Sequence, residues 1–260
     1  MYALKMAPTA DLTVTAAGGA AWLIAEFFGK KALGPAECLW CDRNLDGADQ
    51  LNGFDRFGRG ARWGFDDQRT AAKLSDAIGF VALPASMVGL EALVAYQDGA
   101  LSETPNDLLI IAEAAVLSAV VNQTIKFVAQ RERPFVHALS SEQRLTTADP
   151  HDNNLSFYSG HTSFTFAMAT AAGTVAELRG YRNSWLVWAV GMPLAGLTGY
   201  LRMAADKHYL SDVLVGAAVG SAFGVGVPLL LHPRNGRLNT GPVTLRVVPS
   251  ANGVGVVGSF

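Results

Sequence analysis

A histidine, a carboxylate and an arginine in the last quarter of the chain have types and spacing suited to nucleophilic chemistry on an anion. His208 and Asp212 stand four residues apart, so they are neighbours on one helix face. A carboxylate beside one ring nitrogen fixes the tautomer and makes the other nitrogen a better nucleophile. Arg202 adds a permanent cation whose planar fork fits phosphate oxygens. A surface ion pair would explain the His–Asp pair alone, but not its position beside an arginine between two apolar segments.

A second histidine lies at a predicted helix start. Ser159, Gly160 and His161 stand just before an apolar run, where a helix N-terminus is expected. Ser159 can cap this helix, Gly160 lets backbone N–H groups approach a ligand, and the N-terminus attracts anions. His161 can then donate a proton to a leaving oxygen. Taken alone, the segment is equally well explained as a capping motif with an incidental histidine.

Two further cations stand at the end of another apolar run. Lys126 and Arg133 are seven residues apart, which places them two turns apart on one face if the helix continues that far. Pro134 disfavours helix at Arg133 and releases it into a loop. Two cations at a helix mouth can clamp an anion, although a Lys and an Arg reaching toward water at a membrane edge would look the same.

Six apolar segments must position these residues. Each is close to the ~20 residues that a membrane-spanning helix needs. The segments are 12–28, 78–96, 108–128, 162–178, 185–203 and 213–231. A soluble helical bundle with buried core helices is the competing interpretation. We favour membrane spans because segments of this length are more often spans than core helices.

Composition and charge narrow the class of protein. Of the 260 residues, 50% are hydrophobic and only 16% are charged, whereas a soluble domain carries about 25% charged residues. The formal net charge of −2 provides no global field for nucleic acid, so no nucleic-acid partner is expected. The length suits one domain with a sizeable core.

Together the three clusters resemble the type 2 phosphatidic acid phosphatase (PAP2) superfamily, to which vanadium haloperoxidases are also related. The resemblance covers roughly residues 75–232, and the order and separation of the motifs agree with the family signature. The matching positions are Lys126, Arg133, Pro134, Ser159, Gly160, His161, Arg202, His208 and Asp212. Two positions depart from the pattern: Tyr158 stands where the family usually has Pro, and Leu201 where it usually has Ser.

The resemblance implies a metal-independent phosphatase that acts through a phosphohistidine. His208 would attack phosphorus while Asp212 orients its imidazole. His161 would protonate the leaving group and then activate water. The implied phosphate-binding residues are Lys126, Arg133, Ser159, Gly160 and Arg202. No cofactor and no metal are expected, because three cations already surround the phosphoryl group.

The expected fold is all-α: a six-helix PAP2-type transmembrane bundle over residues 1–234, with the core motifs within 126–212. Residues 235–260 form a tail in which Asn252-Gly253 between two β-type runs predicts a hairpin. The expected partners are membrane lipid and a lipid phosphate or diphosphate substrate; the oligomeric state is not determined by the sequence. We expect a bacterial-type inner membrane location.

The order of the motifs also predicts an orientation. They lie at the ends of segments three and five and at the starts of segments four and six, which is one side of an alternating bundle. Arg179, Arg182 and Lys5 then share the other side, as the positive-inside rule prefers, so the active site should face the periplasm or the outside. Lys30 and Lys31 in the 29–74 loop argue against this orientation.

Three alternatives remain open. The chain could be a soluble periplasmic acid phosphatase of the same superfamily, a vanadate-dependent haloperoxidase, or a non-catalytic membrane protein with a degenerate pocket. Fractionation, halide oxidation with vanadate and phosphate release distinguish these from the membrane phosphatase.

The cysteines and the other histidines are expected to be structural. Cys38 and Cys41 lack the βαβ surroundings of a thioredoxin motif and the further ligands of a zinc site, which leaves a local disulfide or two free thiols. We favour the disulfide. His137, His151 and His232 lie outside the motifs and are predicted to be structural or solvent-exposed.

Overall fold

The computed structural model describes residues 1–44, 48–61, 67–137, 139–238, 244–250 and 253–259. The longer helices are α1 (Pro8–Ile24), α4 (Gln68–Ala77), α5 (Leu83–Gln97), α6 (Thr104–Ala129), α9 (Gly160–Arg179), α10 (Trp185–Ala204) and α11 (Leu210–Leu231). The shorter ones are α2 (Lys30–Leu33), α3 (Gly53–Gly60), α7 (Pro134–His137) and α8 (Ser141–Leu145). The strands are β1 (Tyr2–Leu4), β2 (Arg234–Arg237), β3 (Thr244–Ser250) and β4 (Gly253–Ser259).

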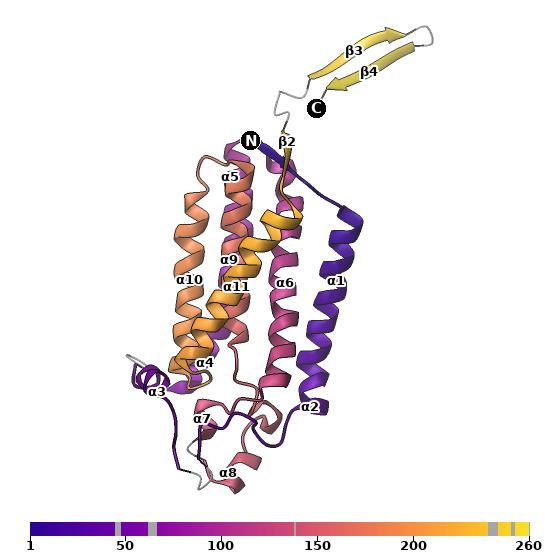
Figure 1. Ribbon diagram of the computed structural model, residues 1–260. Coiled ribbons are helices and arrows are strands. Elements are labelled where there is room, and N and C mark those ends of the chain that lie inside the picture. The colour runs from indigo at the N-terminus through magenta and orange to yellow at the C-terminus, as the bar shows by residue number, and fades with distance from the viewer. Residues whose placement is uncertain (45–47, 62–66, 138, 239–243, 251–252, 260) are drawn as a thin grey trace.

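The long helices run side by side in an elongated bundle, with α9 at its centre (Figure 1). Helix α9 packs against α6, α10 and α11, so almost its whole circumference is covered by protein. Its sequence fits that place, because it is rich in Ala and Thr, whose small side chains let neighbouring helices approach. Its threonine hydroxyls donate to backbone carbonyls of the same helix, as Thr174 does to Thr170 O at 2.7 Å, which satisfies them away from water.

A row of glycines makes the seam between α9 and α11 close. Gly216, Gly220 and Gly224 recur every four residues on α11 and therefore share one face. A Cβ added at Gly220 would lie 2.2 Å from the carbonyl oxygen of Ser163, and one at Gly224 would lie 2.0 Å from Thr170 Oγ1. Only glycine permits this backbone approach.

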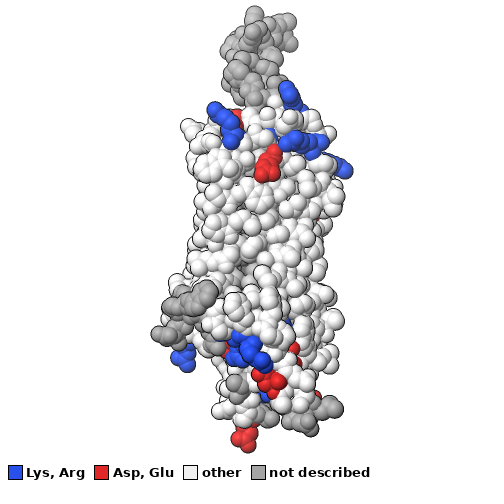
Figure 2. All heavy atoms as spheres, turned by 60° about the vertical axis from the view of Figure 1, so that its left-hand side comes forward, with Lys and Arg blue, Asp and Glu red and all other residues white. Residues whose placement is uncertain are grey.

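Membrane insertion is supported by four helical stretches long and apolar enough to cross a bilayer: Pro8–Leu33, Gln68–Gln97, Leu101–Ala129 and Leu210–Leu231. On the face shown in Figure 2, Lys, Arg, Asp and Glu gather at the two ends of the bundle and leave an uncharged band between them. Large apolar side chains such as Leu23 and Ile24 on α1, and Phe28 in the π-helical turn that follows it, are exposed, as expected for a surface in contact with lipid.

The predicted count of six spans is not confirmed. A helix covers each predicted segment, but α9 and α10 fall outside the four spanning candidates. For α9 the reason is its central position: a helix surrounded by other helices can carry polar residues, because it does not face lipid. The second predicted segment also begins earlier than expected, since α4 continues through a π-helical turn at Ile78–Ala82 into α5.

The loop expected between the first two segments contains helices and a disulfide. Helices α2, α3 and the first part of α4 occupy about half of its described residues. Cys38 and Cys41 are disulfide-bonded, with Cα atoms 5.4 Å apart, so of the two interpretations the disulfide is confirmed.

Two small antiparallel pairs of strands complete the fold. Strand β1 pairs with β2, so the segment before α1 is joined to the segment after α11. Strands β3 and β4 pair along their whole length: Thr244 lies opposite Ser259 at one end, and Ser250 lies opposite Gly253 at the other. This pair is the predicted hairpin. The turn residues 251–252, and Val243 and Phe260 at the ends of the predicted runs, lie outside the described residues.

Candidate active site

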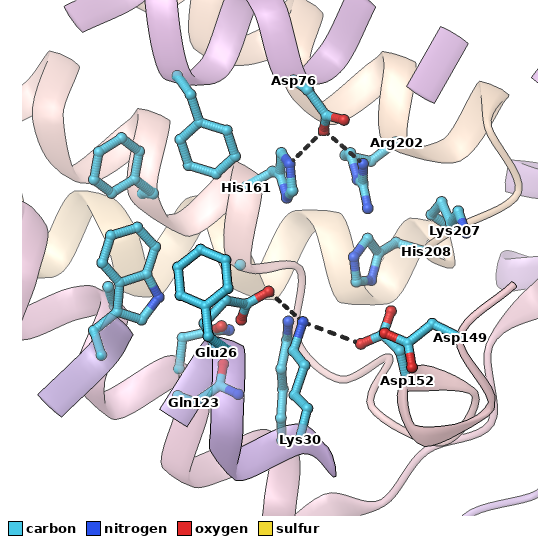
Figure 3. Close-up of a pocket in the computed structure, with 18 of the residues that line it drawn as sticks. Glu26, Lys30, Asp76, Gln123, Asp149, Asp152, His161, Arg202, Lys207 and His208 are labelled. Atoms are coloured by element: carbon cyan, nitrogen blue, oxygen red, sulfur yellow. Dashed lines mark hydrogen bonds and ion pairs between the residues drawn. The ribbon is translucent and has the colours of Figure 1, made fainter. Parts of the chain in front are cut away.

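A cavity of about 650 Å³ lies near α2, between α1, α4, α6, α9 and α10 (Figure 3). Its polar lining includes Glu26, Lys30, Asp76, Asn122, Gln123, Lys126, Arg133, Asp149, Asp152, His161, Arg202, Lys207 and His208. Its apolar lining includes Trp22, Leu23, Phe27, Ala72, Phe80, Ala119 and Phe164. Side chains from distant parts of the sequence therefore meet in one space with a charged side and an apolar side.

The imidazole of His208 is held in one orientation by a backbone carbonyl. Its Nδ1 lies 2.9 Å from the carbonyl oxygen of Ser156, which can only accept, so Nδ1 carries the proton. In the neutral ring Nε2 then carries the lone pair, and Arg133 Nη1 donates a hydrogen bond to it at 3.3 Å beside the cavity. Burial lowers the pKa of His208 well below its ordinary value, and the positive charges of Arg133 and Arg202 lower it further. His208 is therefore neutral, and its unprotonated Nε2 lies at the cavity next to Arg133.

Asp212 does not make the direct hydrogen bond to His208 that the spacing predicts. Its Oδ2 lies 3.7 Å from His208 Nδ1, whereas Ser156 Oγ donates to it at 2.6 Å and the Tyr209 N–H at 3.0 Å. Asp212 thus acts on the segment that supplies the carbonyl to His208, and it caps the start of α11. The i,i+4 spacing brings His208 and Asp212 near each other, but Ser156, in the loop before α9, makes the hydrogen bonds to both.

The charge of Asp212 is balanced by Arg131, a residue that the motifs did not indicate. Arg131 Nη1 donates to Asp212 Oδ1 at 2.8 Å, and Nη2 donates to Asp55 at 2.7 Å and to Asp42 at 2.9 Å. The guanidinium is completely buried between the rings of Trp40 and Tyr209, 4.0 and 4.1 Å from their centroids.

Arg133 reaches the cavity because α6 ends before it. Gln130 adopts a left-handed conformation (φ 45°) at the C-cap of α6, so Arg133 lies in the following segment, as Pro134 predicts, and not on the helix face. Its guanidinium donates to Lys207 O at 2.9 Å and forms an ion pair with Asp152 at 2.7 Å. Burial opposes ionisation of Asp152, but the charges of Arg133 and Lys30 outweigh burial and hold the pKa of Asp152 well below its usual range.

Lys126 lies at the other wall of the cavity, one turn before the end of α6, with only 6% of its surface exposed. The N-terminus of α9 approaches it closely: a Cβ at Gly160 would lie 3.3 Å from Lys126 Nζ and 2.7 Å from Asn122 Oδ1. Glycine at this position therefore brings the first turn of α9 next to the lysine.

Ser159 differs from the prediction. It stands at the N-cap of α9 but makes no side-chain capping bond; its Oγ shares a 2.8 Å hydrogen bond with Thr162 Oγ1. It is fully buried and absent from the lining of the cavity, because its N–H is bonded to the carbonyl of Asp212 and this turns the residue into the protein.

His161 and Arg202 share one carboxylate. Asp76 Oδ1 lies 2.8 Å from His161 Nε2 and 3.4 Å from Arg202 Nη1 (Figure 3). Ser75 Oγ accepts a further hydrogen bond from Arg202 at 3.1 Å, and Phe80 packs against the imidazole of His161. Both predicted residues are held at the cavity wall by helix α4, which the motifs do not include.

Most predicted site residues meet in the cavity. Six line it: Lys126, Arg133, Gly160, His161, Arg202 and His208. Ser159 and Asp212 lie behind this lining. Of the departures from the family pattern, Leu201 is buried with Ala71 and Ala204 in a cluster between α4 and α10, and Tyr158 is buried with its carbonyl accepting from Asn122 Nδ2 at 2.7 Å.

Sequence reasoning missed several polar residues of the cavity. Lys30 bridges Glu26 and Asp152, the latter at 3.2 Å (Figure 3). The i,i+4 spacing of Glu26 and Lys30 at the end of the first apolar segment was a usable signal. Asp76 stands two residues before the second predicted segment, and no pattern in the sequence indicates that Asp152 returns to the site.

Two π-helical turns contribute to the apolar side of the cavity. The turn at Ala25–Gly29 carries Phe27, and the turn at Ile78–Ala82 carries Phe80. A π-turn adds one residue to a helical turn and rotates the side chains that follow it, and such turns are frequent at functional sites. Trp22 of α1 and Phe164 of α9 stack with ring centroids 5.9 Å apart and extend this apolar wall.

The remaining histidines lie outside the cavity. His137 is buried between Glu132 and Asp49, and His151 is exposed, both as predicted. His232 is buried near the opposite end of the bundle.

The sequence of the chain matches a known superfamily over about half of its length. A sequence model described as the PAP2 superfamily matches residues 107–235. A curated lipid A 1-phosphatase from Porphyromonas gingivalis is 43% identical over 70 residues, which are 26% of this chain and only 15% of that protein. A solved structure of a transmembrane PAP2-type phosphatidylglycerolphosphate phosphatase from Bacillus subtilis is 19% identical with a TM-score of 0.37, over 67% of this chain and 90% of that one.

Proposed function

Since the chain belongs to the PAP2 superfamily, we propose that it is a phosphatase that hydrolyses a phosphomonoester or diphosphate of a lipid through a phosphohistidine intermediate. The observation that carries the proposal is the cavity itself. A neutral histidine with an unprotonated Nε2, a second histidine and five basic side chains border one space large enough for a phosphoryl group. The basic residues are Lys30, Lys126, Arg133, Arg202 and Lys207, and three of them, Lys126, Arg133 and Arg202, belong to the sequence motifs.

In the first step His208 Nε2 attacks phosphorus. The N–P bond forms while the P–O bond to the leaving group breaks, and His161 gives its proton to the departing oxygen. The Ser156 carbonyl holds the Nδ1 proton throughout, which stabilises the positive charge that develops on the ring of His208.

In the second step water attacks the phosphohistidine. His161, now without its proton, accepts a proton from the water while the N–P bond breaks and inorganic phosphate is released. Burial and the positive charge of Arg202 lower the pKa of His161, and the hydrogen bond to Asp76 opposes this lowering, so Asp76 is the group that supports the protonated ring between steps.

The basic side chains stabilise charge on the three equatorial oxygens of the transition state. In phosphoryl transfer, catalysis is mainly positioning and electrostatic stabilisation. Arg133 and Arg202 are held by hydrogen bonds before substrate arrives, so little reorganisation is needed. We propose that these cations do the work for which other phosphatases use a metal ion.

A lipid substrate is favoured by the apolar side of the cavity. Trp22, Phe27, Phe80 and Phe164 border the same space as the charged residues, and α1 exposes a broad apolar surface. A phosphorylated headgroup can meet the cations while the first part of its hydrocarbon stays among these rings. The similarity to a lipid A 1-phosphatase points the same way. We also propose that the cavity faces the periplasm or the outside, since Lys5, Arg179 and Arg182 lie toward the opposite end.

A phosphate-release panel with the purified full chain tests the function. The substrates are phosphatidate, phosphatidylglycerol phosphate, a polyprenyl diphosphate, lipid A and a short water-soluble phosphoester, each with wild type and His208→Ala. We expect release from at least one lipid, much faster than from the soluble ester, and none from the variant. Preference for the soluble ester would replace the lipid substrate by a small phosphoester. No release from any substrate, or halide oxidation with added vanadate, would reject a phosphatase.

A further inference from the structure

A group of three ionisable side chains lies at the other end of the bundle from the cavity. Asp11 belongs to the first turn of α1, Glu113 to α6, and His232 directly follows α11. Their ligand atoms all lie within 4.8 Å of one another. The exposed fractions are only 8%, 3% and 1%, so the three groups face one another inside the protein.

The orientation of His232 presents a lone pair to this group. Nδ1 lies 2.9 Å from the carbonyl oxygen of Lys5, which can only accept, so Nδ1 carries a proton. Nε2 then faces Glu113 Oε2 at 3.0 Å. If the ring is neutral and Glu113 is ionised, the lone pairs of Nε2 and Oε2 face each other and repel. A positively charged species between the two atoms removes this repulsion, and it can be a proton or a metal ion.

The negative charge of the two buried carboxylates favours a divalent metal ion over a single proton. Within the described chain, no lysine or arginine forms an ion pair with Asp11 or Glu113; Asp11 accepts only the Ala7 N–H, at 2.8 Å. Protonating His232 would still leave two buried carboxylates against one positive charge. Buried charge without compensation is costly, and a divalent ion neutralises both carboxylates.

The donor set and its surroundings fit a transition metal. One imidazole nitrogen and two carboxylates suit a divalent ion such as Zn²⁺. Ligands around a tetrahedral zinc lie about 3.3 Å apart; His232 Nε2 and Glu113 Oε2 are 3.0 Å apart, and Asp11 lies within 4.8 Å of both. Metal-ligating histidines almost always donate their other N–H to a carbonyl or carboxylate, as His232 does to Lys5. We propose that Asp11, Glu113 and His232 bind a divalent transition-metal ion that is structural and separate from catalysis.

Such an ion would join the parts of the fold that close the bundle at this end. Lys5 N–H also donates to Pro233 O at 2.9 Å, directly next to the paired strands β1 and β2. One ion would therefore link the start of α1, the core helix α6 and the end of α11. The proposal does not depend on the substrate or on the phosphatase activity.

Metal binding is tested on the full chain in detergent after stripping with a chelator and dialysis. The probes are Zn²⁺ and Co²⁺, with Mg²⁺ as a hard-ion comparison. We expect one equivalent of Co²⁺ to produce a visible d–d band, and Zn²⁺ at a hundredfold excess over Kd to raise the melting temperature by roughly 5–10 °C. Glu113→Gln and His232→Gln should lose both responses, whereas the exposed control His151→Gln should keep them.

X-ray absorption of the wild-type zinc sample keeps the test independent of variants that fail to fold. We expect a first shell of nitrogen and oxygen with one imidazole. Stripped wild type that stays folded and shows neither band nor melting shift would overturn the proposal in favour of a proton shared by His232 and Glu113. Responses that persist in both variants, or an absorption spectrum without imidazole, would also overturn it, because the ion would then bind elsewhere.

Discussion

At the scale of single residues, the proposed nucleophile His208 is held by a backbone carbonyl more than by the carboxylate next to it. His208 Nδ1 is bonded to Ser156 O, and Asp212 lies one contact further away, bonded to Ser156 Oγ. Arg131 neutralises Asp212 from the other side. The carboxylate therefore positions the segment that orients His208, so its loss should be less damaging than loss of the ring.

Replacement of His208 by alanine should abolish turnover, because no other side chain beside it can form the bond to phosphorus. Asp212→Asn should lower kcat less, since the Ser156 carbonyl still orients the ring. His161→Ala should lower kcat by about 10²–10⁴ for substrates with an alkoxide leaving group and much less for a nitrophenyl ester, whose phenolate needs no proton. Steady-state kinetics with both substrates measures these differences.

The covalent intermediate provides the control. A phosphoenzyme labile to acid and stable to base should be trapped in wild type, persist in His161→Ala and vanish in His208→Ala. Label on Ser159 or His161 would show that the nucleophile is wrongly assigned.

Lys207 should limit activity at alkaline pH. Burial, followed by the positive charges of Arg133 and Arg202, lowers its pKa from the ordinary value to about 8, and it lines the cavity. A lowered pKa means that the charge is lost above about pH 8, so KM should rise by roughly tenfold between pH 7 and pH 9.5 as one charged contact to phosphate disappears. The measurement is KM against pH with a fixed phosphate substrate.

Lys207→Arg is the matched variant, because a guanidinium stays protonated throughout this range. Its KM should remain flat up to pH 9.5. A rise in KM of equal size in wild type and variant would assign the alkaline change to another group.

At the scale of elements, the seam between α9 and α11 sets the distance between His161 and His208, the two histidines for which we propose a catalytic role. Helix α9 begins one residue before His161, and α11 begins two residues after His208. The glycines of α11 bring the two helix backbones into contact. If the two helices move apart, the ends that carry the two histidines therefore move apart as well.

Gly220→Ala should therefore reduce both stability and turnover. Its Cβ would lie 2.2 Å from Ser163 O, and backbone cannot move aside as a flexible side chain can. Overpacking of this kind costs about 1–3 kcal/mol. Thermal unfolding in detergent and kcat at low temperature measure the two effects.

Gly226→Ala on the same helix has open space around its Cβ and serves as the control. It should leave turnover unchanged and be neutral or slightly stabilising, because alanine favours helix over glycine. Equal effects of the two variants would mean that helix propensity, and not the close seam, accounts for the loss.

At the scale of the whole molecule, the charged ends and the uncharged band of Figure 2 indicate a protein that stays in the bilayer. The intact chain should partition with membranes, resist extraction by high salt and carbonate, and require detergent to dissolve. Buried Glu91 and Glu113 face the bundle interior, so they do not oppose insertion. An intact chain that remains soluble without detergent after high-speed centrifugation would favour the soluble acid phosphatase.

Turnover should not need a divalent metal in the cavity, because Lys126, Arg133 and Arg202 supply the positive charge there. Initial rates measured well below the unfolding temperature should survive EDTA, while vanadate should inhibit as a trigonal-bipyramidal mimic of the transition state. Loss of the initial rate on chelation, restored by magnesium, would contradict this. Working at low temperature separates catalysis from any loss of stability caused by removing a structural ion.

Residue types and spacing by themselves predicted which helices form and most of the predicted site residues that line the cavity. Apolar segments of about twenty residues predicted the long helices, and Pro134 predicted that Arg133 leaves its helix. The order of the motifs along the chain predicted that His161 and His208 lie at the starts of two helices on the same side of the bundle. These features are local, since helix formation and chain breaks depend on neighbouring residues, and so they are visible in the sequence.

Tertiary structure alone decided how the site residues are held. Asp76 reaches His161 across 85 positions of sequence, and Arg131 reaches Asp212 across 81. The bond to His208 comes from a backbone carbonyl, which has no side-chain signature, and Ser159 turns inward because its N–H is bonded to the carbonyl of Asp212. Such contacts depend on the rotation of each helix about its axis and on the paths of the loops. Packing of the whole bundle sets both, so no local pattern records them.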